Sequence, residues 1–272
     1  MATARELFDQ GQLAAAIEAV TSEVKANPTD LQRRTFLFEL LCFAGAWDRA
    51  EKQIDVLAQQ SLESAIGVQV YRDNIKAERE RKRLFAEGTH PHFLNEPPEY
   101  VDTQLAAIEA LRRGDLGAAR EGLDRAEELR PALAGTWNGE PFADFRDYND
   151  LTGPILELIV KDKYTWLPLE QVRRIEIDPP KELRDLIWVP ARIQAADGTT
   201  GEVYVPALYA GSSEHTDDAV RLGRMTDWKA LREDLYVGAG LRLFLTDGEE
   251  RSILETRAIE IDLSNAGTSP SA

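Results

Sequence analysis

The sequence predicts an α+β protein: an N-terminal helical repeat domain followed by a small, mostly antiparallel β domain, either a curled sheet or a barrel. Three observations support this prediction. A glycine-centred motif recurs with a 34-residue period in the first half. From about residue 154 apolar residues alternate with polar ones, which is the period of a strand. Asp-Gly pairs interrupt this second half, as they do in hairpins.

The repeat is marked by Gly11, Gly45 and Gly114, each followed by small residues. The second glycine lies 34 residues after the first (45 − 11), and the third lies 69 residues, about two periods, after the second (114 − 45). Pro28 and Pro131 each follow the glycine of their own copy by 17 residues. Glycine allows a left-handed turn between two helices, and proline ends the second helix. These marks resemble those of a tetratricopeptide repeat.

Apolar spacing of three and four residues predicts the helices of this half. Leu13, Ile17, Val20 and Val24 form one such face. The stretch 61–87 is expected to form one longer helix, 88–98 a loop, and 105–129 a further helix pair. Stacked pairs of this kind present a concave side that binds a peptide or a helix.

The second half is expected to contain five to seven strands. Residues 161–163 can turn the chain, 181–186 can form a short helical turn, and Asp197-Gly198 predicts a hairpin. A second hairpin is expected between 241–245 and 253–261, joined through 246–249. The predicted organisation is therefore a helical repeat domain at 1–133, a linker at 134–153, a β domain at 154–263 and a disordered tail at 264–272.

Charge and composition narrow the range of possible binding partners and cellular locations. The formal net charge is −16, so the chain should repel nucleic acid and anionic lipid. The one basic run, 79–83, is interpreted as a solvated helix end. No apolar stretch is long enough to span a bilayer, residues 1–6 lack the pattern of a secretory signal, and the lone Cys42 is expected in the core. We expect a cytoplasmic protein that binds neither nucleic acid nor membrane.

No familiar catalytic motif is found in the sequence, and His90 and His92 lack a third ligand nearby, so no catalytic residue, metal or cofactor is predicted. The densest acidic run is interleaved with aromatic residues, a mixture typical of a contact surface or of a segment that clamps two domains together. The predicted partner-binding residues are Trp137, Phe142, Asp144, Phe145, Arg146, Asp147 and Tyr148.

Four blocks carry a family resemblance: NGEPFADFRD (138–147), PPKELRDLIWVPAR (179–192), GEVYVPALY (201–209) and LGRMTDW (222–228). With them the chain resembles the ImpE family, also called TagJ or SciE-type proteins, of bacterial type VI secretion systems. The resemblance extends from about residue 7 to residue 261. It implies an accessory protein of the bacterial cytoplasm that binds the small, TssB-like subunit of the contractile sheath through a helix near that subunit's N-terminus. It further implies a link to the AAA+ ATPase that recycles contracted sheath.

Two other readings stay open at this point. Asp144, Asp147 and Asp150 are the residues that a hydrolase or a metal-dependent enzyme would use, because paired carboxylates hydrolyse glycosides and bind Mg²⁺. A homodimeric assembly scaffold is the other alternative. The adaptor interpretation is preferred, since helical repeats accept helices and the family carries no catalytic residues.

Overall fold

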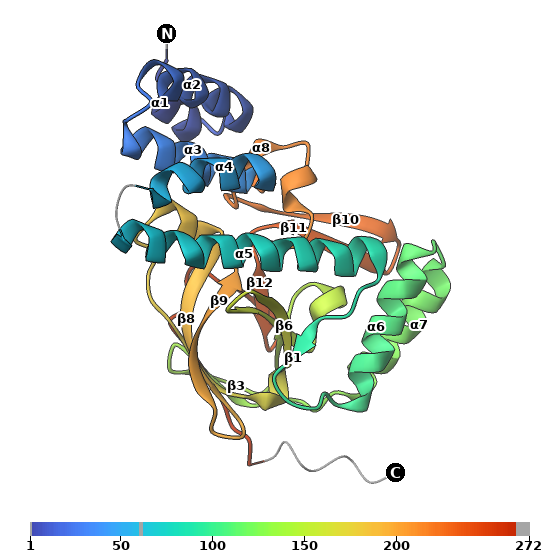
Figure 1. The fold of residues 1–272 in the computed structure, drawn as a ribbon. Helices are drawn as coiled ribbons and strands as arrows, with labels where there is room; N and C mark the ends of the chain where they lie inside the picture. The colour runs from blue at the N-terminus through green and yellow to red at the C-terminus, as the bar shows by residue number, and fades with distance from the viewer. Residues whose placement is uncertain (1, 60–61, 265–272) are drawn as a thin grey trace.

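The chain combines stacked helices with a curved β sheet, which confirms the predicted α+β class (Figure 1). The structure is a computed structural model that describes residues 2–59 and 62–264, without the side chains of residues 62–66. The disordered tail predicted at 264–272 lies outside the described residues, apart from Ser264.

The longest helix runs across the molecule between the other N-terminal helices and the sheet (Figure 1). No helix in the described ranges is both long enough and apolar enough to span a bilayer. The helices are α1 (Ala4–Asp9), α2 (Leu13–Ala26), α3 (Leu31–Phe43), α4 (Trp47–Ala58), α5 (Leu62–Glu87), α6 (Glu99–Arg112), α7 (Leu116–Leu129) and α8 (Asp218–Arg221).

The three repeat glycines lie where the period places them, at the turns between α1 and α2, α3 and α4, and α6 and α7. Their φ angles are +77° at Gly11, +64° at Gly45 and +79° at Gly114, a left-handed conformation that suits glycine. Helices α1 to α5 pack in succession, whereas α6 and α7 form a separate pair at the far end of α5 (Figure 1). The third copy therefore does not extend the stack formed by the first two.

The main sheet has nine strands in the order β1-β6-β5-β9-β8-β7-β14-β2-β3, antiparallel throughout except for β1 beside β6. It is curved, and β1 and β3 are its edges. Two smaller sheets, β10-β11 and β13-β12-β4, accompany it. The strands are β1 (His92–Phe93), β2 (Gly135–Trp137), β3 (Glu140–Phe142), β4 (Phe145–Asp147), β5 (Ile155–Val160), β6 (Lys163–Pro168), β7 (Val172–Ile177), β8 (Trp188–Ala195), β9 (Thr200–Pro206), β10 (Thr226–Arg232), β11 (Leu235–Gly240), β12 (Leu243–Thr246), β13 (Glu249–Ser252) and β14 (Ala258–Ile261).

The Asp197-Gly198 hairpin forms as predicted between β8 and β9. The second hairpin turns at the predicted place, but its partner strand is wrong: β12 pairs with the short β13 at 249–252, and β14 returns to the main sheet beside β7. The segment expected to be a linker, 134–153, contains β2, β3 and β4. Strands β2 and β3 form a hairpin about Asn138-Gly139, a pair that tolerates positive φ and is a local hairpin signal that the linker prediction overlooked. The other partners, β14 for β2 and β12 for β4, lie about a hundred residues later.

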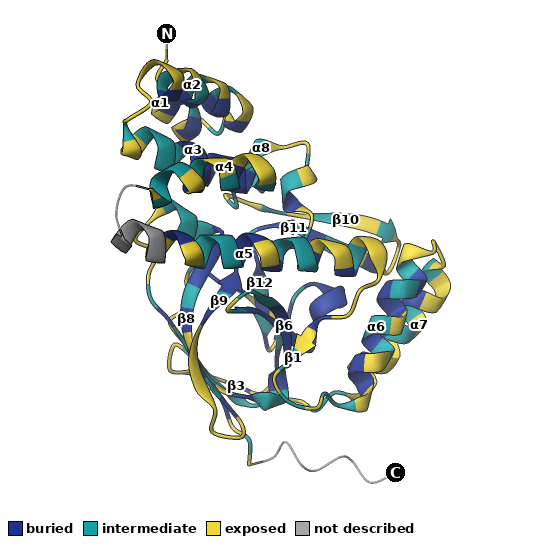
Figure 2. Ribbon diagram, in the orientation of Figure 1, coloured by how far each residue is buried: buried dark blue, intermediate teal, exposed yellow. Residues whose placement is uncertain are grey.

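One hydrophobic cluster spans both halves and joins residues of α1 to α7 to Trp166 and Trp188 of the sheet. Figure 2 shows the buried face of α5 turned toward the sheet. A second cluster fills the interior of the β region.

The C-terminal half also completes two helix ends of the N-terminal half. Asp218 accepts the Leu13 amide at 2.8 Å, where α2 begins with no side-chain cap of its own. Arg224 donates to the carbonyl oxygens of Phe8 (2.7 Å) and Asp9 (2.9 Å) at the end of α1. Each charge has the sign that the helix dipole favours at that end.

Candidate functional site

The basic run 79–83 forms the junction between the helices and the sheet, and interpreting it as a solvated helix end is wrong for its central residue. Arg81 is only 3% exposed and faces the sheet from α5. Its neighbour Arg79 faces the other way and pairs with Asp48 (2.7 Å) and Glu51 (2.8 Å) of α4. The run therefore ties α5 to both layers.

Arg81 enters a buried ionic network with Glu157, Arg242 and Asp147, whose side chains are all at most 4% exposed. The Arg81 Nε and Nη2 atoms donate to the two carboxylate oxygens of Glu157 at 2.7 and 3.0 Å, and Nη2 also donates to the Leu208 carbonyl at 2.9 Å. Arg242 donates to both Glu157 and Asp147. Two cations thus meet two fully buried anions, and Glu78, whose side chain is 12% exposed, lies 3.6 Å from Arg81 as a third carboxylate. Such pairing is a condition for burying charge at tolerable cost.

The two carboxylates differ in their titration. Burial raises the pKa of Glu157, but the guanidinium groups of Arg81 and Arg242 outweigh this effect and lower it to about 2. Burial raises the pKa of Asp147 to about 6, because it has the single guanidinium of Arg242 against it and the charge of Glu157 nearby. Glu157 is therefore the fixed anion of the network and Asp147 is the group that titrates first.

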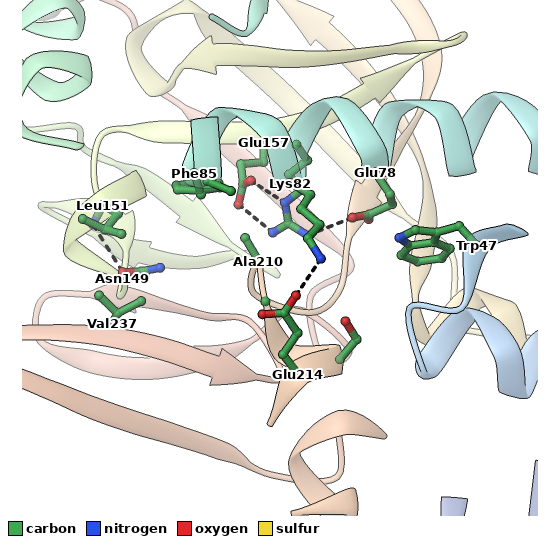
Figure 3. Close-up of a pocket in the computed structure, with 14 residues that line it drawn as sticks. Trp47, Glu78, Lys82, Phe85, Asn149, Leu151, Glu157, Ala210, Glu214 and Val237 are labelled. Atoms are coloured by element: carbon green, nitrogen blue, oxygen red, sulfur yellow. Dashed lines mark hydrogen bonds and ion pairs between the residues drawn. The ribbon is translucent and has the colours of Figure 1, made fainter. Parts of the chain in front are cut away.

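A cleft of about 280 Å³ opens above this network, between α5, α4 and the loop that follows β9 (Figure 3). We call it the α5 cleft. Its apolar lining comes from Trp47, Phe85, Leu151 and Val237, while Arg81 and Glu157 lie at its base. Trp47 is held in place by stacking on Trp188, with ring centroids 6.2 Å apart.

Charged side chains line the mouth of the α5 cleft. Lys82 and Glu214 pair across it at 2.7 Å, and each side chain is 64% exposed (Figure 3). Glu78 accepts from the Trp188 indole nitrogen at 3.2 Å. Aromatic walls with carboxylates beside them suit an apolar or cationic side chain presented by a partner.

The structure separates the seven predicted partner-binding residues. Phe142, Phe145 and Asp147 are buried and support the fold. The other four are half-buried, and two of them face other parts of the β region: the Trp137 indole nitrogen donates to Thr256 at 3.1 Å and Tyr148 packs on Trp228 at 4.5 Å. The partly exposed members of the set are Trp137, Asp144, Arg146 and Tyr148.

Each carboxylate of the acidic run, Asp144, Asp147 and Asp150, pairs with at least one arginine. Asp144 pairs with Arg130 at 2.5 Å. Asp150 pairs with Arg146 and with Arg120, and Asp147 pairs with Arg242. Over the described ranges, no group of three or more His, Cys, Asp or Glu residues could hold a metal ion.

The functional residues that sequence reasoning missed are Arg81, Glu157 and Trp47. For Arg81 the helical spacing predicts burial. It lies seven residues after Asn74 and three before Leu84, which places it on the buried face of α5. Glu157 stands in an otherwise apolar strand, ILELIV, where a lone carboxylate suggests a buried ion pair. Nothing local predicts that Trp47 borders a cleft.

Fold and site together define a protein with a helical-repeat layer joined to a curved antiparallel sheet through a buried ionic junction, with a side-chain-sized cleft beside it. The family model described as ImpE protein matches residues 139–260. The chain is 35% identical over 263 residues to the type VI secretion system accessory component TagJ of Pseudomonas aeruginosa, covering 97% of this chain and 92% of that protein. This chain belongs to the ImpE family of type VI secretion accessory proteins, which includes TagJ.

A solved structure shares the whole architecture. The X-ray structure of a Vibrio parahaemolyticus protein superimposes with a TM-score of 0.88 at 26% identity, covering 95% of this chain and 97% of that one. The joining of the helical layer to the sheet is therefore found in an experimental structure as well.

Proposed function

We propose that this protein is a non-catalytic adaptor of a type VI secretion system in the bacterial cytoplasm. It binds the small subunit of the contractile sheath through a helix near that subunit's N-terminus and links it to the AAA+ ATPase that recycles the sheath. Membership of the ImpE family supports the secretion role. The observation that carries the adaptor role is the α5 cleft, an open, aromatic-lined site where the repeat helices meet the sheet.

The cleft suits one anchoring side chain of an amphipathic helix. Trp47 and Phe85 supply rigid apolar surface, and hot spots in interfaces are built around such anchors. The carboxylates of Glu78 and Glu214 favour a partner helix with lysine or arginine beside its apolar stripe. The net charge of −16 would speed the approach of such a helix.

The test is calorimetric titration of the full chain with a synthetic peptide of the N-terminal helix from the sheath small subunit encoded alongside it. We expect saturable one-to-one binding with a dissociation constant of about 1 μM. The whole chain is needed, because one hydrophobic cluster spans both halves.

Charge variants at the cleft mouth sharpen the test. Glu214→Lys should weaken binding several-fold at low salt and less at high salt, mainly through the association rate. The double variant Lys82→Glu/Glu214→Lys restores the local net charge and is the matched control, which should bind nearly as the parent does. Absence of binding by the folded protein, seen by calorimetry and by a second method, would refute the link to the sheath.

A further inference from the structure

Asn74 is a buried polar side chain whose hydrogen bonds are missing. It lies on α5, two turns before Arg81 and on the same face, and is 1% exposed. Neither its Oδ1 nor its Nδ2 atom has a hydrogen-bond partner among the residues that the structure describes. A buried amide without partners destabilises a fold, so its presence calls for something that satisfies it.

A second cleft, of about 390 Å³, lies beside this side chain between α5 and the sheet. We call it the Asn74 cleft. Its apolar lining is formed by Val70, Ile159, Val203 and Tyr204. It is separate from the α5 cleft, since the two share no lining residue.

Strands β5 and β9 meet at this cleft with little pairing. In the described part of the chain their ladder consists of the single pair Ile159 and Tyr204. Val160 and Val203 come next in register but do not continue it. The pairing of the sheet is thus sparse beside the cleft that Asn74 lines.

Two unpaired charges lie at the rim of the same cleft, beside the ion pair of Asp178 and Arg192. Within the described ranges, Lys161 and Glu202 form no ion pair, and both side chains are exposed at its rim. Lys161 is held in a left-handed conformation, with φ of +55°, at the β5–β6 turn. A rim with both signs of charge and an apolar floor suits a peptide that carries acidic and basic groups.

We propose that the Asn74 cleft binds an extended peptide segment and that Asn74 pairs with its main chain. A carboxamide presents one acceptor and a donor side by side. In an extended chain the N–H and C=O of one residue point to the same side, so they match the carboxamide in a two-point hydrogen bond. This inference goes beyond the adaptor proposal, because it concerns a different cleft and an extended rather than a helical ligand.

The probe is N-acetyl-trialanine methylamide, followed by NMR on the full chain labelled with ¹⁵N. The side-chain amide signals of Asn74, assigned by their loss in Asn74→Leu, should shift saturably with a dissociation constant of about 1 mM, as befits a ligand this small. The matched control probe carries an N-methyl group on the central alanine. It keeps the apolar surface but lacks the donor, so it should bind about tenfold more weakly.

Variants separate the site from a general effect on α5. Asn74→Leu should abolish the shifts at Val203 and Tyr204, whereas Gln69→Leu, an exposed change on the same helix, should preserve them. Equal shifts with both probes, or none at Asn74, overturn the proposal. So does a long-lived water bound to the amide that the peptide fails to displace. The wild-type titration decides the question even if Asn74→Leu does not fold, and it is independent of any binding to the sheath subunit.

Discussion

Replacing Glu157 by glutamine should destabilise the protein by about 3–5 kcal/mol, although the two side chains have nearly the same shape. Glu157 is 1% exposed and is shared by Arg81, Arg242 and the Tyr164 hydroxyl at 2.5 Å. In the variant, Arg242 keeps Asp147, but Arg81 loses its bidentate partner and retains only Glu78, 3.6 Å away. One buried cation is then poorly compensated, and this cation accounts for the expected loss.

The double variant Arg81→Met/Glu157→Gln tests the reasoning. It removes one charge of each sign and leaves Arg242 paired with Asp147, so the fully buried part of the network is neutral again and only the partly exposed Glu78 loses its arginine. Arg81→Met alone should cost about 3–5 kcal/mol, and the double variant should cost clearly less than the sum of the two single changes. The assay is urea unfolding followed by tryptophan fluorescence, with the slope checked for a constant two-state transition.

Lys82→Met supplies the control, because Lys82 lies on the same helix as Arg81 but both side chains of its ion pair with Glu214 are 64% exposed. That change should cost at most about 1 kcal/mol. Additive effects of Arg81→Met and Glu157→Gln, or a cost for Glu157→Gln no larger than that of Lys82→Met, would show that the network does not hold the two layers together.

Two further predictions concern protons and thiols. The destabilisation caused by Arg81→Met should shrink as the pH falls from 7 to 4. Loss of this guanidinium raises the pKa of Glu157 from about 2, so the folded variant takes up a proton that the folded parent does not. Urea titrations at several pH values measure the difference in stability, and a difference that stays constant with pH would contradict the prediction. Cys42 is 2% exposed, and burial raises the pKa of its thiol. An aromatic disulfide reagent should therefore label it at least about a hundredfold more slowly in the native protein than in urea. Rapid labelling of the native protein would contradict the buried position.

Local signals were enough to predict much of the fold. The repeat glycines had to adopt left-handed turns, and they do so at Gly11, Gly45 and Gly114. Asp197-Gly198 likewise produced the expected hairpin, because two adjacent residues that tolerate positive φ determine such a turn. Strand β4 was not predicted, since its partner β12 lies about a hundred residues later, whereas the β2–β3 hairpin had a local signal in Asn138-Gly139 that was assigned to a linker.

The site was harder to predict for the same reason. Arg81 belongs to a run of charges that looks solvated until Glu157, 76 residues later, is placed opposite it. The aromatic and acidic residues at 137–148 looked like a surface, yet Phe142 and Phe145 are buried, and Phe145 packs on Phe244 at 5.2 Å. A sequence pattern distinguishes apolar from polar positions, but which buried charges meet depends on how the layers are assembled.

The contacts that complete α1 and α2 have a consequence for synthesis in the cell. The Leu13 amide is capped by Asp218, 205 residues later, and the carbonyl groups of Phe8 and Asp9 accept hydrogen bonds from Arg224. At translation rates of about 5–20 residues per second, the first two helices leave the ribosome roughly 10–40 s before these partners exist. The helices that are synthesised first therefore complete their terminal hydrogen bonds last. During that interval the newly made helices must rely on each other, or on a chaperone, to cover the surface that the end of the chain will later occupy.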